Sequence, residues 1–495
     1  MGYNGDYHCG TTGGRLSRSV ALYALTGILV TAVQPVHAGE WTVSPSVGVT
    51  TTFTDNANAA NDDEDRNSDQ VLTLSPGVRV SGSGGRLSLN LAYTHNQFFS
   101  RQGQSDDSST DTLTANGRAE VWDRVAFVDL TSSISREVVD PAQTDTSTDL
   151  GNDNNRTTVQ TVSISPFFLH HFGNWLETES RTTFDLTRTE SDEISNTRSL
   201  GSTFSATSGR RFSVFTFGGT FDRQKEIRED GAPRSITTTL NTNQRLRLSR
   251  KFSVITSIGW ESIDDPALSE EPEGIIWEVG FSAQPSSRSS IEMTVGDRFE
   301  TTTYGMDASY RFSSRSSMSA SYTETLTTSQ EQRNENLDFL VSDGSGGFID
   351  SRTGNTFDAS GSELGFQTSL FRQKILALNF NTTRRRGSYS AGLNWERRET
   401  DSTGIEETVL SVNAAASRTL SSRLSASVST SLSFTDFGTT DQRKDRDLSL
   451  TGSLTYRLME NTNAALSYTR SQTSSSEGSN NFEENAVTLS LTRNF

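Results

Sequence analysis

The chain is short of cysteine, lysine and apolar residues, and each shortage narrows what it can be. Cys9 is the only cysteine among 495 residues, which excludes a disulfide framework and a thiolate metal site. Hydrophobic residues make up 32% of the chain, against about 45–50% in an ordinary globular domain. Such a chain cannot fill a close-packed core of its size, but it can build a hollow structure whose inner wall faces water.

Low hydrophobicity and a formal net charge of -17 are also typical of intrinsic disorder. Against this, 27 Phe, 10 Tyr and 6 Trp residues recur at regular intervals, so we expect disorder only in acidic loops. The net acidity argues against a nucleic-acid binder, which would show a basic stripe. Only four of the 44 basic residues are lysines. This excess of arginine fits either genomic base composition or a function of the guanidinium groups.

The first 38 residues predict a secretory signal peptide. Arg15 and Arg18 precede an apolar run over residues 20–33, and the small-residue site at residues 36–38 predicts cleavage after Ala38. The run is shorter than the roughly 20 residues that a transmembrane helix needs. We therefore expect an exported mature chain of residues 39–495 that has lost Cys9.

Beyond this leader the recurring pattern is alternation with period two, which indicates strands. Between Leu424 and Phe434 every odd position is serine, and the even positions are apolar apart from Thr430. Successive strand side chains point to opposite faces, so each such strand has one apolar and one polar face. Residues 448–458, 87–93, 318–322 and 389–395 repeat the pattern.

Short polar turns and longer polar connections alternate along the chain, as they do in outer-membrane barrels. The longer connections include residues 55–69, 138–155, 225–233, 263–273, 436–445 and 471–484. The tight turns lie at residues 81–86, 121–124, 172–175, 208–212, 249–251, 285–288, 313–317, 384–388, 420–423 and 459–463. Ten tight turns predict an all-β, antiparallel, up-and-down transmembrane barrel of about 22 strands, within a range of 16 to 24, with both termini on the periplasmic side.

Arginines indicate which face points inward. An arginine on the lipid face near the midplane costs about 2–4 kcal/mol, so the face that carries arginines should line the lumen. A closed apolar interior is excluded, because side chains fill a barrel only up to about eight strands. The expected lumen-facing residues are Arg79, Arg118, Arg245, Arg247, Arg311 and Arg457.

Aromatic residues on the apolar face predict contacts with the membrane interfaces. Tyr93, Trp395, Tyr456 and Tyr468 lie near the ends of predicted strands and suit the aromatic girdles of such barrels, with ordinary aromatic packing as the alternative. The last strand ends at Phe495, as in the C-terminal strand by which outer-membrane barrels are recognised for assembly. Arg493 departs from that pattern, but near a rim it can reach the interface.

No catalytic or metal-binding arrangement is apparent, and we expect no enzyme activity, no cofactor and no metal. His95 shares the parity of the apolar face, and the neighbours His170 and His171 point to opposite faces. The acidic runs at residues 62–65 and 145–153 lack the spacing and the central glycine of a calcium loop.

Residues 327–373 break the hairpin rhythm with a long, glycine-rich polar segment. Loops of this length are uncommon unless they are functional or disordered. We expect an external loop or one folded into the lumen that constricts the pore. Unchanged conductance after deletion of residues 343–358 would exclude that role.

Short stretches resemble a known family. Residues 41–47 (WTVSPSV), 53–56 (FTDN) and 370–374 (LFRQK), together with Phe495, resemble the outer-membrane barrels that accompany PEP-CTERM and exosortase-linked exopolysaccharide gene clusters. The resemblance implies a part in polysaccharide export or surface assembly, and it implies no catalytic residue.

Two functions remain open for a barrel in the bacterial outer membrane. The first is a pore or export barrel for a polar, including an anionic, exopolysaccharide, since arginine binds carboxylates bidentately. The second is a non-conducting barrel that anchors an envelope assembly. The expected partners are membrane lipid and lipopolysaccharide, the barrel assembly machinery and polysaccharide-export components. A TonB-dependent receptor is disfavoured, because no plug-sized segment lies between Gly39 and the first strand.

Overall fold

The computed structural model describes residues 39–61, 66–101, 109–139, 155–191, 194–229, 234–265, 268, 272–298, 301–342, 347–352, 357, 362, 364–366, 369–400, 404–438 and 443–495. The predicted signal peptide and its cleavage site lie outside these residues. Among the described residues, no helix is long and apolar enough to cross a bilayer.

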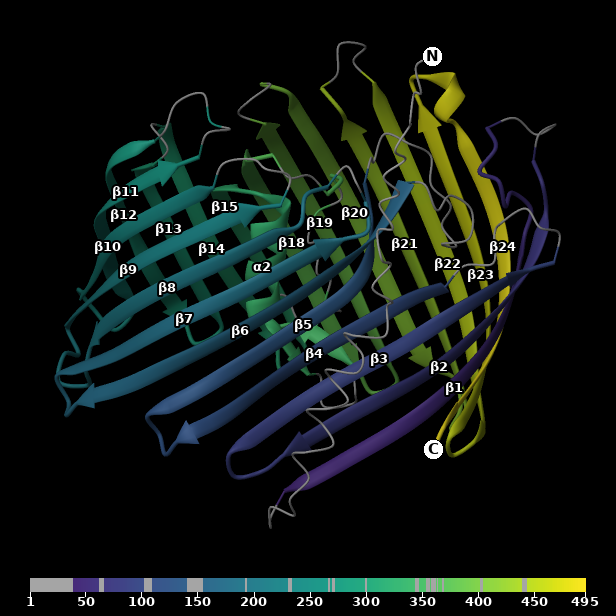
Figure 1. The fold of residues 1–495 in the computed structure, drawn as a ribbon, viewed down its shortest axis with the longest axis horizontal. Helices are drawn as coiled ribbons and strands as arrows, with labels where there is room; N and C mark the ends of the chain where they lie inside the picture. Colours follow the sequence, from purple (N-terminus) through teal and green to yellow (C-terminus); the bar gives the residue numbers. More distant parts are fainter. Residues whose placement is uncertain are drawn as a thin grey trace, which may run out of the picture.

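A single sheet of 22 antiparallel strands forms the wall of the molecule (Figure 1). Each strand pairs with its neighbour in the chain, β15 pairs with β18, and β1 pairs with β24, so the sheet closes into a barrel. The first eleven strands are β1 (Glu40–Thr54), β2 (Asp69–Ser83), β3 (Leu87–Ser100), β4 (Ser109–Trp122), β5 (Ala126–Val138), β6 (Arg156–Phe172), β7 (Leu176–Thr189), β8 (Thr197–Ser208), β9 (Phe215–Arg228), β10 (Ser235–Arg247) and β11 (Phe252–Asp264). The others are β12 (Glu273–Ser286), β13 (Ser289–Arg298), β14 (Thr301–Ser313), β15 (Ser316–Thr327), β18 (Phe371–Arg384), β19 (Gly387–Thr400), β20 (Glu406–Thr419), β21 (Leu424–Asp436), β22 (Lys444–Met459), β23 (Thr462–Ser475) and β24 (Phe482–Asn494).

All ten predicted tight turns join consecutive strands, which confirms the fold class and the strand number. In the turn between β6 and β7, Gly173 adopts a φ of 58°, a left-handed conformation that glycine reaches without a steric penalty. The end of β24 returns to the rim where β1 begins, and the backbone N–H of Phe495 donates to the carbonyl of Pro45 over 2.8 Å. The turns and the C-terminus therefore lie on one rim, and the longer connections lie on the other.

Strands extend further toward the long-loop rim than the apolar alternation suggests. β6 has 17 residues and β22 has 16, whereas about ten residues cross an apolar band about 25 Å tall. The predicted loops at residues 225–233 and 471–484 are correspondingly shorter, because β9 continues to Arg228 and β23 to Ser475. Backbone hydrogen bonding continues past the membrane band, where side-chain polarity no longer has to alternate.

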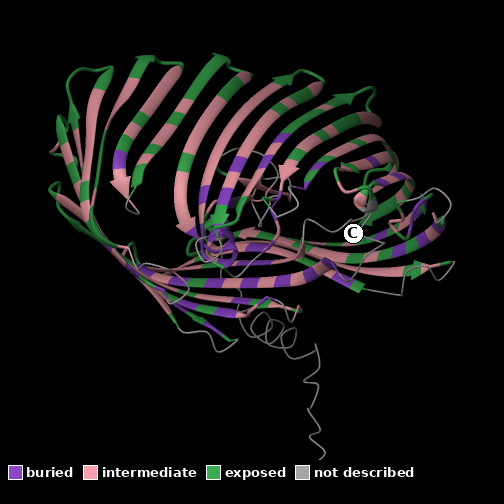
Figure 2. Cartoon of the chain, turned by 90° about the horizontal axis from the view of Figure 1, so that it is seen from above, coloured by how far each residue is buried: buried purple, intermediate pink, exposed green. Residues whose placement is uncertain are grey.

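The long segment between β15 and β18, residues 328–370, is called the insert below. Its described parts hold the helix α2 (Ser329–Asp338) and a two-stranded sheet of β16 (Leu340–Ser342) and β17 (Phe348–Asp350). Seen from above, α2 lies inside the ring of strands, and buried residues gather around it (Figure 2). A short 3-10 helix, η3 (Gly478–Asn480), precedes β24.

Candidate functional site

The side chains that line a cavity with the insert identify the inner face of the barrel wall. On β9 the alternate residues Asp222, Gln224, Glu226 and Arg228 line a cavity shared with α2, so their neighbours point outward. The pairing register carries this parity around the whole barrel, from β9 through β24 and β1 back to β8. The outward positions hold the exposed large apolar side chains, such as Leu454 and Leu489.

By this register all six arginines predicted to face the lumen lie on its side of the wall. Arg118 donates to both oxygens of Asp129, over 2.6 and 2.9 Å, and Arg245 pairs with Glu292 at 3.0 Å. Arg457 donates to the carbonyl of Ser422 over 2.7 Å. The side chains of Arg79, Arg247 and Arg311 have no partner among the described residues. That these arginines select a solute stays a prediction.

The four predicted interface aromatics all point outward, but not all lie near a rim. Tyr456 is three residues from the end of β22 at a tight turn. Tyr93 and Tyr468 are each the seventh residue of a 14-residue strand, so their placement near strand ends is wrong. Their hydroxyls donate to Asp111 and Asn485 over 2.8 Å. The error arises because the strands continue beyond the apolar pattern.

His95 is also on the outward face, with Nδ1 2.7 Å from an oxygen of Asp111. Trp395 lies outward on β19, where it is paired with Leu376 and Leu410 on the neighbouring strands. Phe495 is exposed at the end of β24. The described residues hold no group of three or more His, Cys, Asp or Glu side chains able to bind a metal.

Helix α2 is fastened to the wall by Arg333, whose guanidinium is completely buried. It donates to Glu137 over 2.5 Å, to Ser135 over 2.7 Å, to Thr161 over 2.9 Å and to Ser133 over 3.1 Å. These partners belong to the inner faces of β5 and β6. A buried guanidinium with a carboxylate partner and several hydroxyl acceptors is satisfied, so this contact fixes α2 in the lumen.

The C-terminal part of the insert contacts β19 on one side of the barrel and β5 on the other. Ser362 donates to Glu396 on β19 over 2.8 Å, and Arg398 donates to the carbonyl of Gly365 over 3.0 Å. The next residue, Phe366, bonds through its backbone N–H to Val138 of β5 and packs with Val159. Since β19 and β5 lie on far-apart parts of the ring, the described residues 362 and 364–366 cross the lumen and narrow it.

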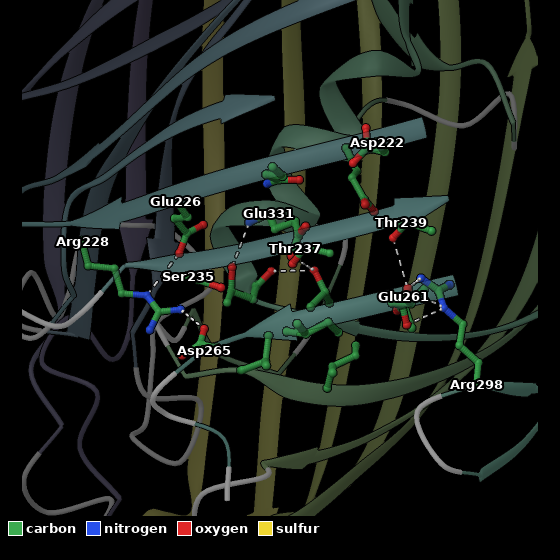
Figure 3. Close-up of a pocket in the computed structure, with 18 residues that line it drawn as sticks. Asp222, Glu226, Arg228, Ser235, Thr237, Thr239, Glu261, Asp265, Arg298 and Glu331 are labelled. Atoms are coloured by element: carbon green, nitrogen blue, oxygen red, sulfur yellow. Dashed lines mark hydrogen bonds and ion pairs between the residues drawn. The ribbon is translucent and has the colours of Figure 1, made fainter. Parts of the chain in front are cut away.

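Between α2 and strands β9 to β15 lies a cavity of about 190 Å³ (Figure 3). Arg228 is held between Glu226 at 3.1 Å and Asp265 at 2.9 Å, and Arg298 donates three hydrogen bonds to Glu261. The helix contributes Glu331 and Glu335 to the lining. Carboxylates therefore face this part of the lumen from both the wall and the helix.

Glu331 belongs to α2, which does not span the membrane, and its carboxyl is strongly perturbed. Burial raises its pKa to about 8, and the charges of Glu335 and Glu226 act in the same direction. The hydroxyl of Thr327 and the backbone of Thr328 oppose this increase. The packed helix thus favours a neutral Glu331.

Docking of α2 should weaken as pH rises. The carboxyl of Glu331 has an ordinary pKa of 4.5 when α2 is released and a pKa of about 8 when α2 is packed. Its protonation therefore stabilises docking fully below pH 4.5, and this stabilisation is lost as pH rises toward 8. Between these values each pH unit costs up to about 1.4 kcal/mol, so single-channel conductance should increase from about pH 5 to about pH 8.5. E331Q should flatten that profile; an equally steep one would rule out this carboxyl as the cause.

Comparisons with known proteins support the fold. Residues 395–495 match the family model described as "Putative beta-barrel porin 2". No curated protein matches. A variant of the ferric enterobactin receptor of Pseudomonas aeruginosa is 10% identical, with a TM-score of 0.52, and the match covers 92% of this chain and 81% of that one.

Two other receptors are similar to the same extent. The siderophore receptor PirA of Acinetobacter baumannii is 8% identical over 92% of this chain and 80% of its own, with a TM-score of 0.50. The ferric-catecholate import receptor Fiu of E. coli K12 is 8% identical over 90% and 81%, also with a TM-score of 0.50. At this identity the likeness shows the fold alone. A closed barrel of this size, apolar outside and polar inside, is an integral protein of the bacterial outer membrane.

Proposed function

We propose that the barrel is a pore for polar, carbohydrate-like solutes and that the insert sets its width. The observation that carries the proposal is an uncharged polar patch on the middle of the inner wall, shared by β18 to β22. There a cavity of about 380 Å³ is lined by Asn379, Asn381, Ser390, Asn413, Ser429, Ser431 and Ser449 together with alanines and Thr430. Hydroxyl and amide groups exchange hydrogen bonds with sugar hydroxyls without a large desolvation cost.

The charged half of the lumen argues for neutral solutes over anionic ones. Carboxylates on the inner faces of β5 to β14 outnumber the arginines there, and several arginines are already paired. The carboxylates are Asp129, Glu137, Glu177, Glu179, Asp185, Asp222, Glu226, Glu261, Glu278, Glu292 and Asp307, and the arginines are Arg181, Arg228, Arg245, Arg247, Arg298 and Arg311. An anionic exopolysaccharide would meet net repulsion on this side, so a neutral polar exopolysaccharide is the solute class we propose.

Replacing Arg245 with alanine should increase cation selectivity. The change leaves Glu292, its partner at 3.0 Å, as an uncompensated lumenal carboxylate. Reversal potentials across a KCl gradient should shift toward potassium by a few millivolts to about ten. The double variant R245A/E292A is the matched control and should restore the original value. An unchanged potential in R245A would mean that this pair does not face the conducting path.

Liposome swelling with neutral oligosaccharides of increasing length tests the proposal as a whole. We expect swelling that declines with chain length, and slower swelling with uronic-acid oligomers of equal size. No swelling and no conductance would contradict a pore.

The second candidate is a non-conducting barrel that anchors an envelope assembly. It is favoured by one observation, the attachment of the insert to both β5 and β19, which leaves less of the lumen open. Capture of periplasmic polysaccharide-export components together with zero conductance would support it. Assembly through the Phe495-terminated strand serves both candidates, and its removal should block insertion.

A further inference from the structure

Four cations stand on the outward face of β7, β8 and β9, and are called the β7–β9 cationic patch. They are Arg188, Arg198, Arg223 and Lys225. Their neighbours along each strand point inward: Thr187 lies beside Thr161 of the lumen wall, and Asp222 lines the insert cavity. Parity therefore places all four cations on the side that faces the membrane.

Most of this positive charge has no counterion among the residues that the structure describes. Arg198 pairs with Glu229 at 2.5 Å, and its side chain is 62% exposed. Arg188, Arg223 and Lys225 have no partner among the described residues. The lumenal arginines next to them are different, because Arg181 and Arg228 each contact two carboxylates. Unpaired cations on the lipid-facing side of the wall are stabilised by an anionic group of the surrounding membrane.

The register brings the patch together. Lys225 is opposite Leu200, Arg198 is opposite Ile227, and Arg223 is opposite Ser202. Lys225 is thus a diagonal neighbour of Arg198, and such neighbours lie about 7–8 Å apart. Several cations can therefore contact one doubly charged headgroup.

The patch lies at the upper edge of the membrane band. A strand residue rises about 3.3 Å along its axis, or about 2.3 Å along the membrane normal at a tilt near 45°. Counted from the tight-turn ends of their strands, Arg223 is then about 19 Å up, Lys225 and Arg198 about 23 Å, and Arg188 about 28 Å. The apolar band is about 25 Å tall, so the cations coincide with its long-loop edge.

Exposed apolar side chains occupy the same face directly below. Phe184, Leu200, Phe204 and Phe221 are between 41% and 51% exposed. Phe221 is two residues below Arg223 on the same face of β9. A ligand that fits this surface has anionic groups for the cations and acyl chains for the apolar side chains nearer the middle of the membrane.

We propose that the β7–β9 cationic patch binds the phosphate groups of lipid A, with its acyl chains against the apolar residues below. Guanidinium and ammonium groups bind phosphate through charge-assisted hydrogen bonds, and basic clusters at a membrane edge recognise anionic headgroups. The long-loop rim faces the outer leaflet, where lipid A is located, so its phosphates are the occupant we commit to.

Native mass spectrometry of the folded full-length mature barrel with bisphosphorylated lipid A tests the site. The double variant R223Q/K225Q should bind at least about tenfold more weakly than wild type, since two charged contacts are lost. The matched control is R384Q/R418Q, which removes two outward arginines beside the tight turns and should bind as wild type does. Heat-modifiable migration on gels verifies that each variant is folded.

Three results would overturn the proposal. One is equal binding by R223Q/K225Q and wild type, and another is an equal loss in R384Q/R418Q. The third is binding of phosphatidylglycerol as tight as that of bisphosphorylated lipid A, which would show a general anionic-lipid surface. Weaker binding of monophosphorylated lipid A is expected, because one phosphate then faces the patch instead of two.

Discussion

Replacing Arg333 with leucine should open the pore. The substitution removes the guanidinium that joins α2 to β5 and β6 and leaves Glu137 without its cation. Breaking a buried ion pair by removing one partner costs about 3–5 kcal/mol, enough to release a ten-residue helix. Single-channel conductance should rise roughly two- to threefold, because a 22-stranded barrel is wide and its contents set the free area.

Arg352 provides the matched control for this experiment. It is an insert arginine whose bonds go to Asp350 and Asn336, both within the insert, so R352L should change conductance little. The barrel strands are untouched in both variants and should remain folded. Unchanged conductance in R333L, with wild-type folding, would mean that α2 does not limit the pore.

The strand pattern could be predicted because one physical constraint fixes it. Residues 424–434 alternate, apart from Thr430, because each even side chain meets lipid and each odd one meets water. The tight turns follow from the same constraint, because polarity stops alternating only where the chain leaves the membrane. The strand ends at the long-loop rim could not be predicted this way. β9 continues to Arg228 and β23 to Ser475, within segments predicted as loops.

The location of the insert could not be predicted, because its contacts are remote in sequence. Arg333 bonds to residues 172 to 200 positions earlier. Leu337 is the one apolar residue of helix α2, so the helix has no apolar periodicity to reveal it. One local signal was present: Thr328 accepts a bond from the N–H of Glu331 over 3.1 Å, the Thr-x-x-Glu pattern that begins a helix.

The outward cations were missed for a different reason. Arginines were assigned to the polar face on the cost of placing them at the midplane, and the strand register places Arg245 and Arg311 on that face. Near an interface that cost falls to about 0–1 kcal/mol, so Arg223 and Lys225 are tolerated on the apolar face. Whether an arginine can lie on the lipid-facing side therefore depends on its height along the strand as well as on whether its position is odd or even.

The most direct test of the account places one arginine on each face of β22. Leu454 points outward, is 45% exposed and lies about 12 Å above the tight-turn end, near the midplane. Its neighbour Thr455 points into the lumen, as Arg457 already does. The free energy of unfolding from lipid vesicles should fall by about 2–4 kcal/mol in L454R and by less than about 1 kcal/mol in T455R. Equal losses, or a larger loss in T455R, would contradict a wet serine- and threonine-lined interior within a lipid-facing apolar wall.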